Sequence, residues 1–169
     1  EIGLEVWSLL KNYWRFGIDS KIKQPAYNDD DLFRDDRAWV YSTEKFLWNS
    51  FWMKSDRRKK LILGFNGGIG YAKMRGKGYF TKFEIDYKPI EPLKISIEAS
   101  QDLTPSYMQY VDIIDIENTI NRIYAKSEQL TNEVEFRVDW TFSPELSLQG
   151  YFQPFYADMR YLSYYELIS

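Results

Sequence analysis

Two pairs of carboxylates have a spacing that is compatible with acid–base chemistry on a sugar. Glu133 and Glu135 are separated by one residue, and so are Glu84 and Asp86. Residues i and i+2 of a strand point to the same face about 6–7 Å apart, and glycoside hydrolysis uses two carboxyl groups at a defined separation. The alternative is a ladder of compensating charges, because basic residues interleave with both pairs. These basic residues are Lys82, Lys88 and Arg137.

The chain contains no histidine and no cysteine. Within this chain that excludes Ser-His-Asp and Cys-His catalysis, and it excludes disulfides, His/Cys zinc sites and iron–sulfur ligation. The net charge is -3 and the pI about 5.1, so no general electrostatic attraction to nucleic acid exists. We therefore expect no enzyme of these classes and no nucleic-acid partner.

Two charged segments offer further chemistry. The acidic loop Asp29–Asp31, with Asp35 and Asp36 nearby, presents the oxygen ligands that Ca²⁺ prefers. Its spacing is not that of an EF-hand, and a solvated loop is the alternative; no other cofactor is expected. The basic segment of Lys54 and Arg57–Lys60 suits either anionic head groups or a charged hairpin end.

Alternation with a period of two dominates the chain, which predicts strands. In Glu133–Phe142, apolar residues alternate without a break with four charged residues and Thr141, so one face of this strand is apolar and the other is mostly charged. We expect about ten antiparallel strands and an all-β fold. The other clear segments are Tyr13–Lys23, Leu61–Ala72, Tyr79–Lys88 and Leu93–Ser100, and the weaker ones are Leu4–Leu10, Phe46–Met53, Tyr107–Ile113, Arg122–Ser127 and Leu146–Phe155.

The connections differ in length in a regular way. Four short turns, Lys11-Asn12, Ser55–Lys59, Lys88–Pro92 and Ser143–Glu145, fall at one end of an up-and-down meander, and the long loop Pro25–Glu44 falls at the other. Short turns at one end and longer loops at the other are typical of outer-membrane barrels.

Aromatic residues near the strand ends favour the same interpretation. Bulky amphipathic rings gather where a membrane meets water. On the apolar faces, the separation from Tyr79 to Tyr87 spans about 20 Å for tilted strands. The predicted interfacial aromatics, each expected on the apolar face of its strand, are Trp14, Trp52, Tyr71, Tyr79, Tyr87 and Trp140.

Alternation alone leaves the direction of the two faces open. A soluble barrel turns its oily face inward around an apolar ligand, whereas a membrane barrel turns its charges inward. The aromatic positions and the loop lengths favour the second arrangement. In it the residues facing the lumen are Arg15, Asp19, Lys82, Glu84, Asp86, Glu133, Glu135, Arg137 and Asp139.

The stretch from Arg122 to Leu167 resembles a known family. The matching residues are Gln129, the run Glu133–Gln149, then Gln153-Pro154-Phe155, Tyr161 and Glu166-Leu167, with further matches at Lys11–Trp14, Arg58–Lys60 and Gly67-Gly68. These segments resemble the C-terminal region of an uncharacterised Gram-negative outer-membrane β-barrel family, domain of unknown function 5916. The resemblance implies an N-terminal carbohydrate-binding-like domain ahead of the barrel and no catalytic residues.

We therefore expect residues 1–169 to form a single domain, a piece of a larger antiparallel up-and-down transmembrane β-barrel that is incomplete at both ends. The expected location is the bacterial outer membrane, and the expected role is to anchor, export or form a conduit for a carbohydrate-recognising protein. The expected partners are outer-membrane lipid, the N-terminal domain and other outer-membrane proteins. Two alternatives stay open, namely a soluble β-barrel that binds an apolar ligand and an outer-membrane enzyme, such as a glycan hydrolase, with a carboxylate site in its lumen.

Overall fold

The computed structural model describes residues 1–28, 41–116 and 119–166. Every regular element in these ranges is a strand. The described residues therefore contain no helix that could cross a membrane. The strands are β1 (Ile2–Leu9), β2 (Arg15–Lys23), β3 (Tyr27–Asn28), β4 (Tyr41–Ser42), β5 (Phe46–Lys54), β6 (Leu61–Ala72), β7 (Gly76–Ile90), β8 (Leu93–Ile116), β9 (Thr119–Ser143), β10 (Leu146–Phe152) and β11 (Phe155–Glu166).

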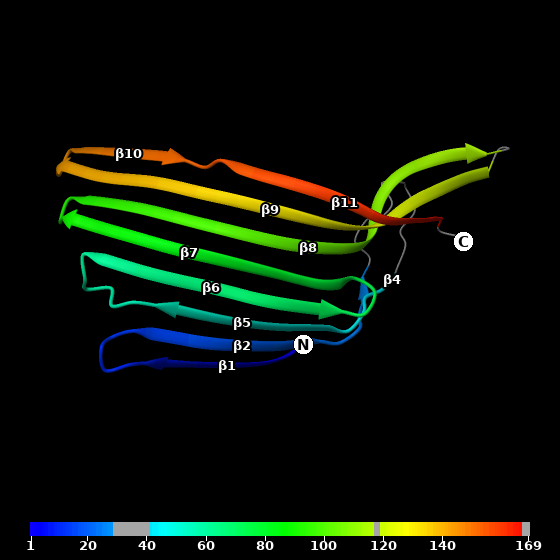
Figure 1. Ribbon diagram of the computed structural model, residues 1–169, viewed down its shortest axis with the longest axis horizontal. Helices are drawn as coiled ribbons and strands as arrows, with labels where there is room; N and C mark the ends of the chain where they lie inside the picture. Colours follow the sequence, from blue (N-terminus) through cyan, green and yellow to red (C-terminus); the bar gives the residue numbers. More distant parts are fainter. Residues whose placement is uncertain (29–40, 117–118, 167–169) are drawn as a thin grey trace.

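Nine of these strands form one antiparallel sheet, and β3 and β4 pair separately at the base of the loop between β2 and β5. The order in the sheet follows the chain, β1-β2-β5-β6-β7-β8-β9, with β10 and β11 both on the far side of β9. The predicted meander is therefore confirmed. All four short turns lie at one end of the sheet, and the connection between β2 and β5 lies at the other (Figure 1).

Strands β10 and β11 lie end to end, and both pair with β9. Phe152 pairs with Phe136 of β9, and Phe155 pairs with Glu133. The break falls at Pro154, which has no N–H to donate to a ladder, although its carbonyl still accepts a bond from the N–H of Val134 at 3.1 Å.

Strands β8 and β9 are much longer than their neighbours. They extend past β7 and the strands before it as a bent hairpin at the end opposite the short turns (Figure 1). The segments Tyr107–Ile113 and Arg122–Ser127, expected to be separate strands, are continuations of β8 and β9. Pro105 lies within β8, beyond Leu103, where the pairing with β7 ends. There β8 has a partner on one side only, so a residue without an N–H is tolerated.

The sheet has almost no dry core. The chain exposes 12316 Å², whereas a compact protein of this mass would expose roughly 8,800 Å². Only four hydrophobic residues of the described chain are buried, namely Ile62, Ala72, Tyr124 and Ala125.

The two edges of the sheet are open. Among the described residues, β1 pairs only with β2, and β10 and β11 pair only with β9. The expectation of an all-β antiparallel fold is thus confirmed, and the sheet does not close on itself.

Candidate functional site

The register of the strands gives the sheet two chemically different faces. Phe83 pairs with Phe65 on one side and Ala99 on the other, while the next residue, Glu84, pairs with Gly64 and Glu98. We call the face of Phe83 the apolar face and the face of Glu84 the charged face. The ladder pairings place all nine charged residues expected to share a face on the charged face: Arg15, Asp19, Lys82, Glu84, Asp86, Glu133, Glu135, Arg137 and Asp139.

The exposure of the two faces is the reverse of that in a water-soluble protein. On β7, Phe83 is 57% exposed and Ile85 is 42% exposed, whereas Lys82, Glu84 and Asp86 between and beside them are half-buried. The same alternation runs through β5, where Met53 is exposed and Lys54 is half-buried. Soluble proteins leave charged groups in water and cover the large apolar ones. Here the charged face is the more enclosed of the two.

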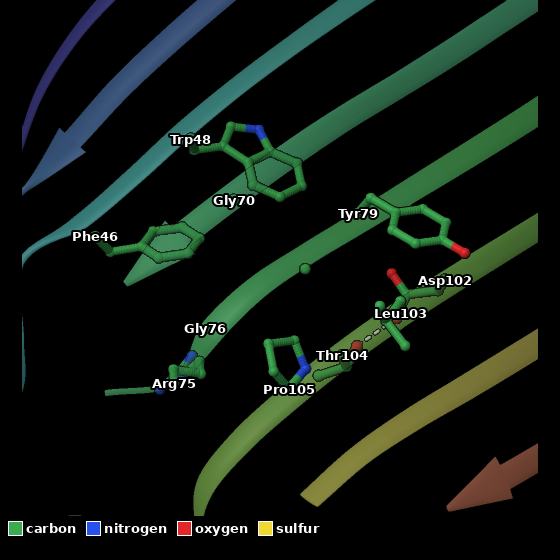
Figure 2. A pocket seen from close by; sticks show the side chains of 11 residues that line it. Phe46, Trp48, Gly70, Arg75, Gly76, Tyr79, Asp102, Leu103, Thr104 and Pro105 are labelled. Atoms are coloured by element: carbon green, nitrogen blue, oxygen red, sulfur yellow. Dashed lines mark hydrogen bonds between the residues drawn. The ribbon is translucent and has the colours of Figure 1, made fainter. Parts of the chain in front are cut away.

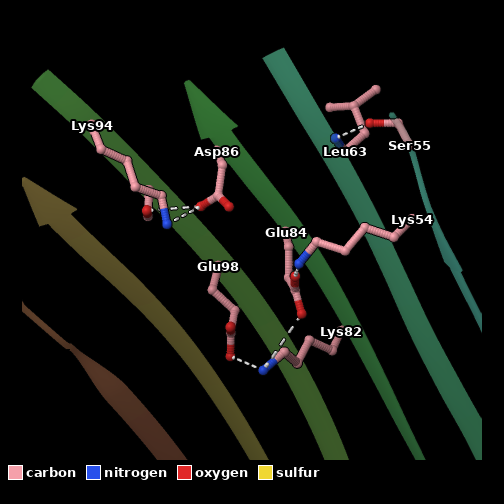
Figure 3. Close-up of polar contacts among 9 residues, drawn as sticks. Lys54, Ser55, Leu63, Lys82, Glu84, Asp86, Lys94 and Glu98 are labelled. Carbon is pink, nitrogen blue, oxygen red and sulfur yellow. Dashed lines mark hydrogen bonds and ion pairs between the residues drawn. The ribbon is translucent and has the colours of Figure 1, made fainter. Parts of the chain in front are cut away.

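Ion pairs join the charged side chains across three strands. Lys54 Nζ lies 2.5 Å from Glu84 Oε2, and Lys82 Nζ lies 2.6 Å from Glu98 Oε1 and 3.9 Å from Glu84 Oε1. Figure 3 shows these contacts as one connected group, with a Lys94–Asp86 pair at 3.1 Å beside it. The lysines thereby offset the repulsion between carboxylates on neighbouring strands, which is unfavourable when like charges lie directly opposite each other.

A glutamate row explains why these lysines are needed. Glu84, Glu98 and Glu135 are direct neighbours on β7, β8 and β9. Lys82 contacts Glu84 and Glu98, and it lies on the same face of β7 two residues before Glu84. The arrangement is a charge ladder, as the interleaved basic residues predicted.

Aromatic side chains occupy the charged face where β6 has glycines. A Cβ at Gly68 would lie 2.8 Å from both Trp48 and Phe80, and a Cβ at Gly70 would lie 2.6 Å from Phe46. The rings of Trp48 and Phe80 are parallel to within 4°, with centroids 5.5 Å apart. Figure 2 shows the indole of Trp48 over β6 at the edge of a cavity of about 110 Å³. The small β6 residues thus make room for rings from β5 and β7.

Comparison with known proteins adds one finding to this geometry. The family model described as Domain of unknown function (DUF5916) matches residues 1–169. The chain belongs to this family. No curated protein and no solved structure matches it.

The family match confirms the domain resemblance noted in the sequence. The best run of matching residues lies in the last third of the chain, and the family model matches all of residues 1–169.

The six aromatics expected near strand ends do not all share a face in this DUF5916 chain. Tyr71, Tyr79, Tyr87 and Trp140 lie on the apolar face. Trp14 directly precedes β2, and its N–H bonds Asn12 Oδ1 at 3.2 Å. The placement of Trp52 on the apolar face was wrong.

Trp52 lies on the charged face because its neighbours leave it space there. The ladder pairs it with Gly17 of β2 and Asn66 of β6. A Cβ at Gly17 would lie 2.5 Å from the indole nitrogen of Trp52, so the ring rests directly on the glycine. The segment Phe46–Met53 has large apolar residues at both alternating positions, so alternation within this strand does not reveal its faces.

A set of polar residues on the apolar face was missed by the sequence analysis. Tyr79 donates its hydroxyl to Gln101 Oε1 at 2.9 Å, and Gln101 Nε2 donates to Asn132 Oδ1 at 2.7 Å. Farther along the sheet, Ser20 donates to Asn49 Oδ1 at 2.8 Å. These side chains satisfy one another across neighbouring strands, so this part of the face presents paired polar groups. A sequence signal exists, since these positions interrupt otherwise apolar alternation.

The carboxylates considered for catalysis are engaged in this DUF5916 chain. Glu84 contacts two lysines, and Asp86 accepts a hydrogen bond from Ser96 at 2.8 Å. Glu133 accepts a hydrogen bond from Gln153. Lysines thus balance the charges of Glu84 and Asp86, whereas the partner of Glu133 is a neutral amide. A catalytic role for these carboxylates stays an untested alternative.

The metal prediction falls outside the structure. Asp29–Asp31 and the neighbouring Asp35 and Asp36 lie outside the described residues. Within the described ranges, no group of three or more carboxylates is placed to hold a metal ion.

The turn between β5 and β6 is tightly organised. Asp56 is only 5% exposed. It accepts hydrogen bonds at 3.0 Å from both the backbone N–H and the side chain of Arg58. These bonds, with the nearby positive charges, lower the pKa of Asp56 to about 2. Arg58 also lies over the ring of Tyr13, 3.3 Å from its centroid, which ties this turn to the neighbouring β1–β2 turn.

Proposed function

We propose that the chain forms part of the wall of an outer-membrane β-barrel, with the apolar face against lipid and the charged face toward the lumen. The observation that carries the proposal is the reversed exposure of the two faces. Uncovered side chains such as Phe83 and Ile85 favour an apolar surrounding, at roughly 25 cal/mol for each Å² of apolar surface removed from water. The paired charges opposite them suit a hydrated or plugged interior.

The stagger of the strands supports a tilted wall. From Phe16, β2 extends only one residue toward the short turns, to Arg15, whereas from Val134, β9 extends nine residues, to Ser143. The two positions are linked through the ladder by Met53, Phe65, Phe83 and Ala99. The stagger is about one and a half residues per strand, which corresponds to a tilt of about 45°. Membrane barrels have tilts of roughly 35–45°.

The apolar band has a height that fits a membrane. On β9 it runs from Val134 to Phe142, which is about 20 Å for a tilted strand. Beyond Val134 the next residue on this face is Asn132, bonded to Gln101. Tyr79, bonded to the same glutamine, then lies where interfacial tyrosines are expected.

The open edges support a larger barrel. The free backbone groups of β1 and of β10 and β11 need hydrogen-bond partners in hydrocarbon, because unpaired amides there cost several kcal/mol each. We infer that further strands of the same protein complete the wall. The N-terminal carbohydrate-binding-like domain implied by the family resemblance would then be anchored or exported by the barrel, or served by it as a conduit. Lipid and other outer-membrane proteins are the remaining partners in this proposal.

A soluble barrel around an apolar ligand is less well supported. Such a barrel needs its apolar residues to converge on an interior, yet two of the four buried hydrophobic residues, Ile62 and Ala72, lie on the charged face. An enzyme with lumenal carboxylates shares the geometry proposed here, and it would be recognised by loss of activity in a Glu133→Gln variant that still folds.

Cysteine labelling tests the proposed orientation. The described chain has no cysteine, and the neighbours Ala99 and Ser100 are small and lie on opposite faces. Each is changed to cysteine in the full-length protein, in a background without other cysteines, and treated with a charged maleimide. In lipid vesicles Ala99→Cys should resist labelling and react after transfer to denaturant, while a lipid-phase quencher should reach a fluorophore attached at this position.

The matched variant Ser100→Cys is the control for the opposite face of the same strand. Its fluorophore should escape the lipid-phase quencher. Rapid labelling of Ala99→Cys in vesicles, with no quenching from the lipid phase, contradicts the proposal.

A further inference from the structure

Two neighbouring turns at the short-turn end of the sheet enclose a basic cavity. Its volume is about 360 Å³. The β5–β6 turn and the β7–β8 turn supply its walls. The lining residues are Arg57, Arg58, Lys59, Lys60, Lys88, Pro89, Ile90 and Glu91. Five cations and one carboxylate give this lining a formal charge of +4, and the charge is +3 when the Asp56 that pairs with Arg58 is included.

Most of these cations have no carboxylate partner. Arg58 is paired with Asp56 at 2.9 Å. In the ranges that the structure describes, the ion pairs do not include Arg57, Lys59, Lys60 or Lys88. In contrast, Lys21, Lys54, Lys82 and Lys94 on the charged face each lie in an ion pair with a glutamate or an aspartate.

Hydrogen bonds hold the two turns together. The N–H of Lys88 donates to the carbonyl of Lys60 at 2.7 Å, and Lys60 Nζ donates to the carbonyl of Pro89 at 3.0 Å. The β5–β6 turn is fixed internally, because Ser55 and Leu63 exchange bonds at 2.7 and 2.8 Å. The like charges are therefore kept close by the backbone rather than left free to separate.

We propose that this cavity binds a phosphate group. Several donors around a rigid cavity match the tetrahedral oxygens of phosphate, and charge-assisted hydrogen bonds from arginine and lysine are stronger than neutral ones. A bound dianion would offset the mutual repulsion of Lys59, Lys60 and Lys88. The site stands on the two turns alone and does not depend on where the apolar face lies.

The phosphate could be carried by a phospholipid headgroup or by a soluble compound. Ile90 in the cavity wall is 52% exposed, and Leu61 and Tyr87 on the adjacent apolar face are 49% and 44% exposed. Acyl chains on that face would bring a headgroup to the turns, and this source rests on the proposed membrane function. Lys60 and Lys88 also lie at the rim of the charged face, where a soluble phosphate ester would enter.

The experiment uses two double variants of the full-length protein in a zwitterionic detergent. Lys59→Gln with Lys88→Gln removes two unpaired cations from the cavity. Lys73→Gln with Lys77→Gln removes the same charge from exposed positions flanking the β6–β7 turn, at the opposite end of the sheet. Calorimetric titration with inorganic phosphate at low ionic strength should give saturable one-site binding for the parent and the control. The cavity variant should bind at least about tenfold more weakly. Equal weakening by both variants, or no saturable binding to the parent, would overturn the proposal.

A second arm identifies the source of the phosphate. The same proteins are placed in nanodiscs of phosphatidylcholine with or without phosphatidylglycerol, and the lipid retained on mild delipidation is measured. Enrichment of phosphatidylglycerol on the parent but not on the cavity variant assigns a headgroup, and phosphate binding without enrichment assigns a soluble ligand. If the protein fails to enter nanodiscs while the titration still shows the site, the membrane function fails and the phosphate site stands.

Discussion

Lys54 and Glu84 form an ion pair across a strand that lies between them. Lys54 belongs to β5 and Glu84 to β7, and the residue between them on β6 is Gly64, which pairs with both in the ladder. The Nζ–Oε2 distance is 2.5 Å, and Figure 3 shows the lysine side chain crossing β6 to reach Glu84. The lack of a side chain at Gly64 is what allows two strands that are not neighbours to share a charge pair.

A side chain at Gly64 should break this pair. A Cβ there would lie 2.9 Å from Glu84 Oε2 and 3.1 Å from Glu84 Cβ, so Gly64→Val should lower the free energy of unfolding by about 1–3 kcal/mol, the usual cost of overpacking. Gly150→Val is the matched control, because a Cβ at Gly150 meets nothing within 4 Å. Guanidinium unfolding of both variants measures the difference, and equal stabilities would contradict the packing argument.

Gly17 and Trp52 should be energetically coupled. Since a Cβ at Gly17 would lie 2.5 Å from the indole nitrogen, Gly17→Ala should cost about 1–3 kcal/mol in the parent protein. In a Trp52→Ala background the same change should cost close to nothing, because the ring that it displaces is gone. The coupling is read from a double-mutant cycle of unfolding free energies, and additive costs would show that the contact is unimportant.

A strand was predictable from the sequence where apolar and polar residues alternate within that one segment. In Glu133–Phe142, alternation identified both the strand and its charged face, because each residue pair differs sharply in polarity. The face of Trp52 was not predictable in this way, since it depends on Gly17 of another strand. The length of β8 was missed for a similar reason, because Pro105 interrupts a strand only where a partner needs its N–H.

The sequence predicted which charged residues share a face, but it did not predict which ion pairs join them. The sequence placed Glu84 and Lys82 on one face and indicated a charge ladder. It did not indicate that Lys54 would complete the ladder, because that contact requires the register of three strands and a glycine in the middle one. The basic cavity likewise depends on two turns that are 28 or more residues apart in the chain and are brought together by the β6–β7 hairpin.

The β5–β6 turn should loosen in acid. The pKa of Asp56 is lowered from 3.8 to about 2 by its hydrogen bonds from Arg58. A carboxyl group whose pKa is lower in the folded state stabilises that state above its unfolded pKa, and this contribution disappears as the pH falls through the folded pKa. Amide hydrogen exchange of Arg58 should therefore accelerate between about pH 4 and pH 2, beyond the intrinsic pH effect. Asp56→Asn should lack this transition, and a transition that persists in that variant would have another origin.

An arginine should be tolerated on one face of β8 and not on the other. Ile97 lies on the apolar face between Ile85 and Phe136, whereas Ser100 lies on the charged face between Lys82 and Glu133. If Ile97 faces hydrocarbon, Ile97→Arg should cost roughly 2–4 kcal/mol in a bilayer, the range measured for arginine near the middle of membrane barrels. Ser100→Arg should cost much less, because a hydrated face with Glu133 at hand can accept the charge. Refolding into vesicles, followed by the heat-dependent change in gel mobility that marks an intact barrel, compares the two variants. A soluble fold with the observed exposure of Ile97, which is 41%, would accept arginine there readily, so normal folding of Ile97→Arg would argue against lipid contact at this face.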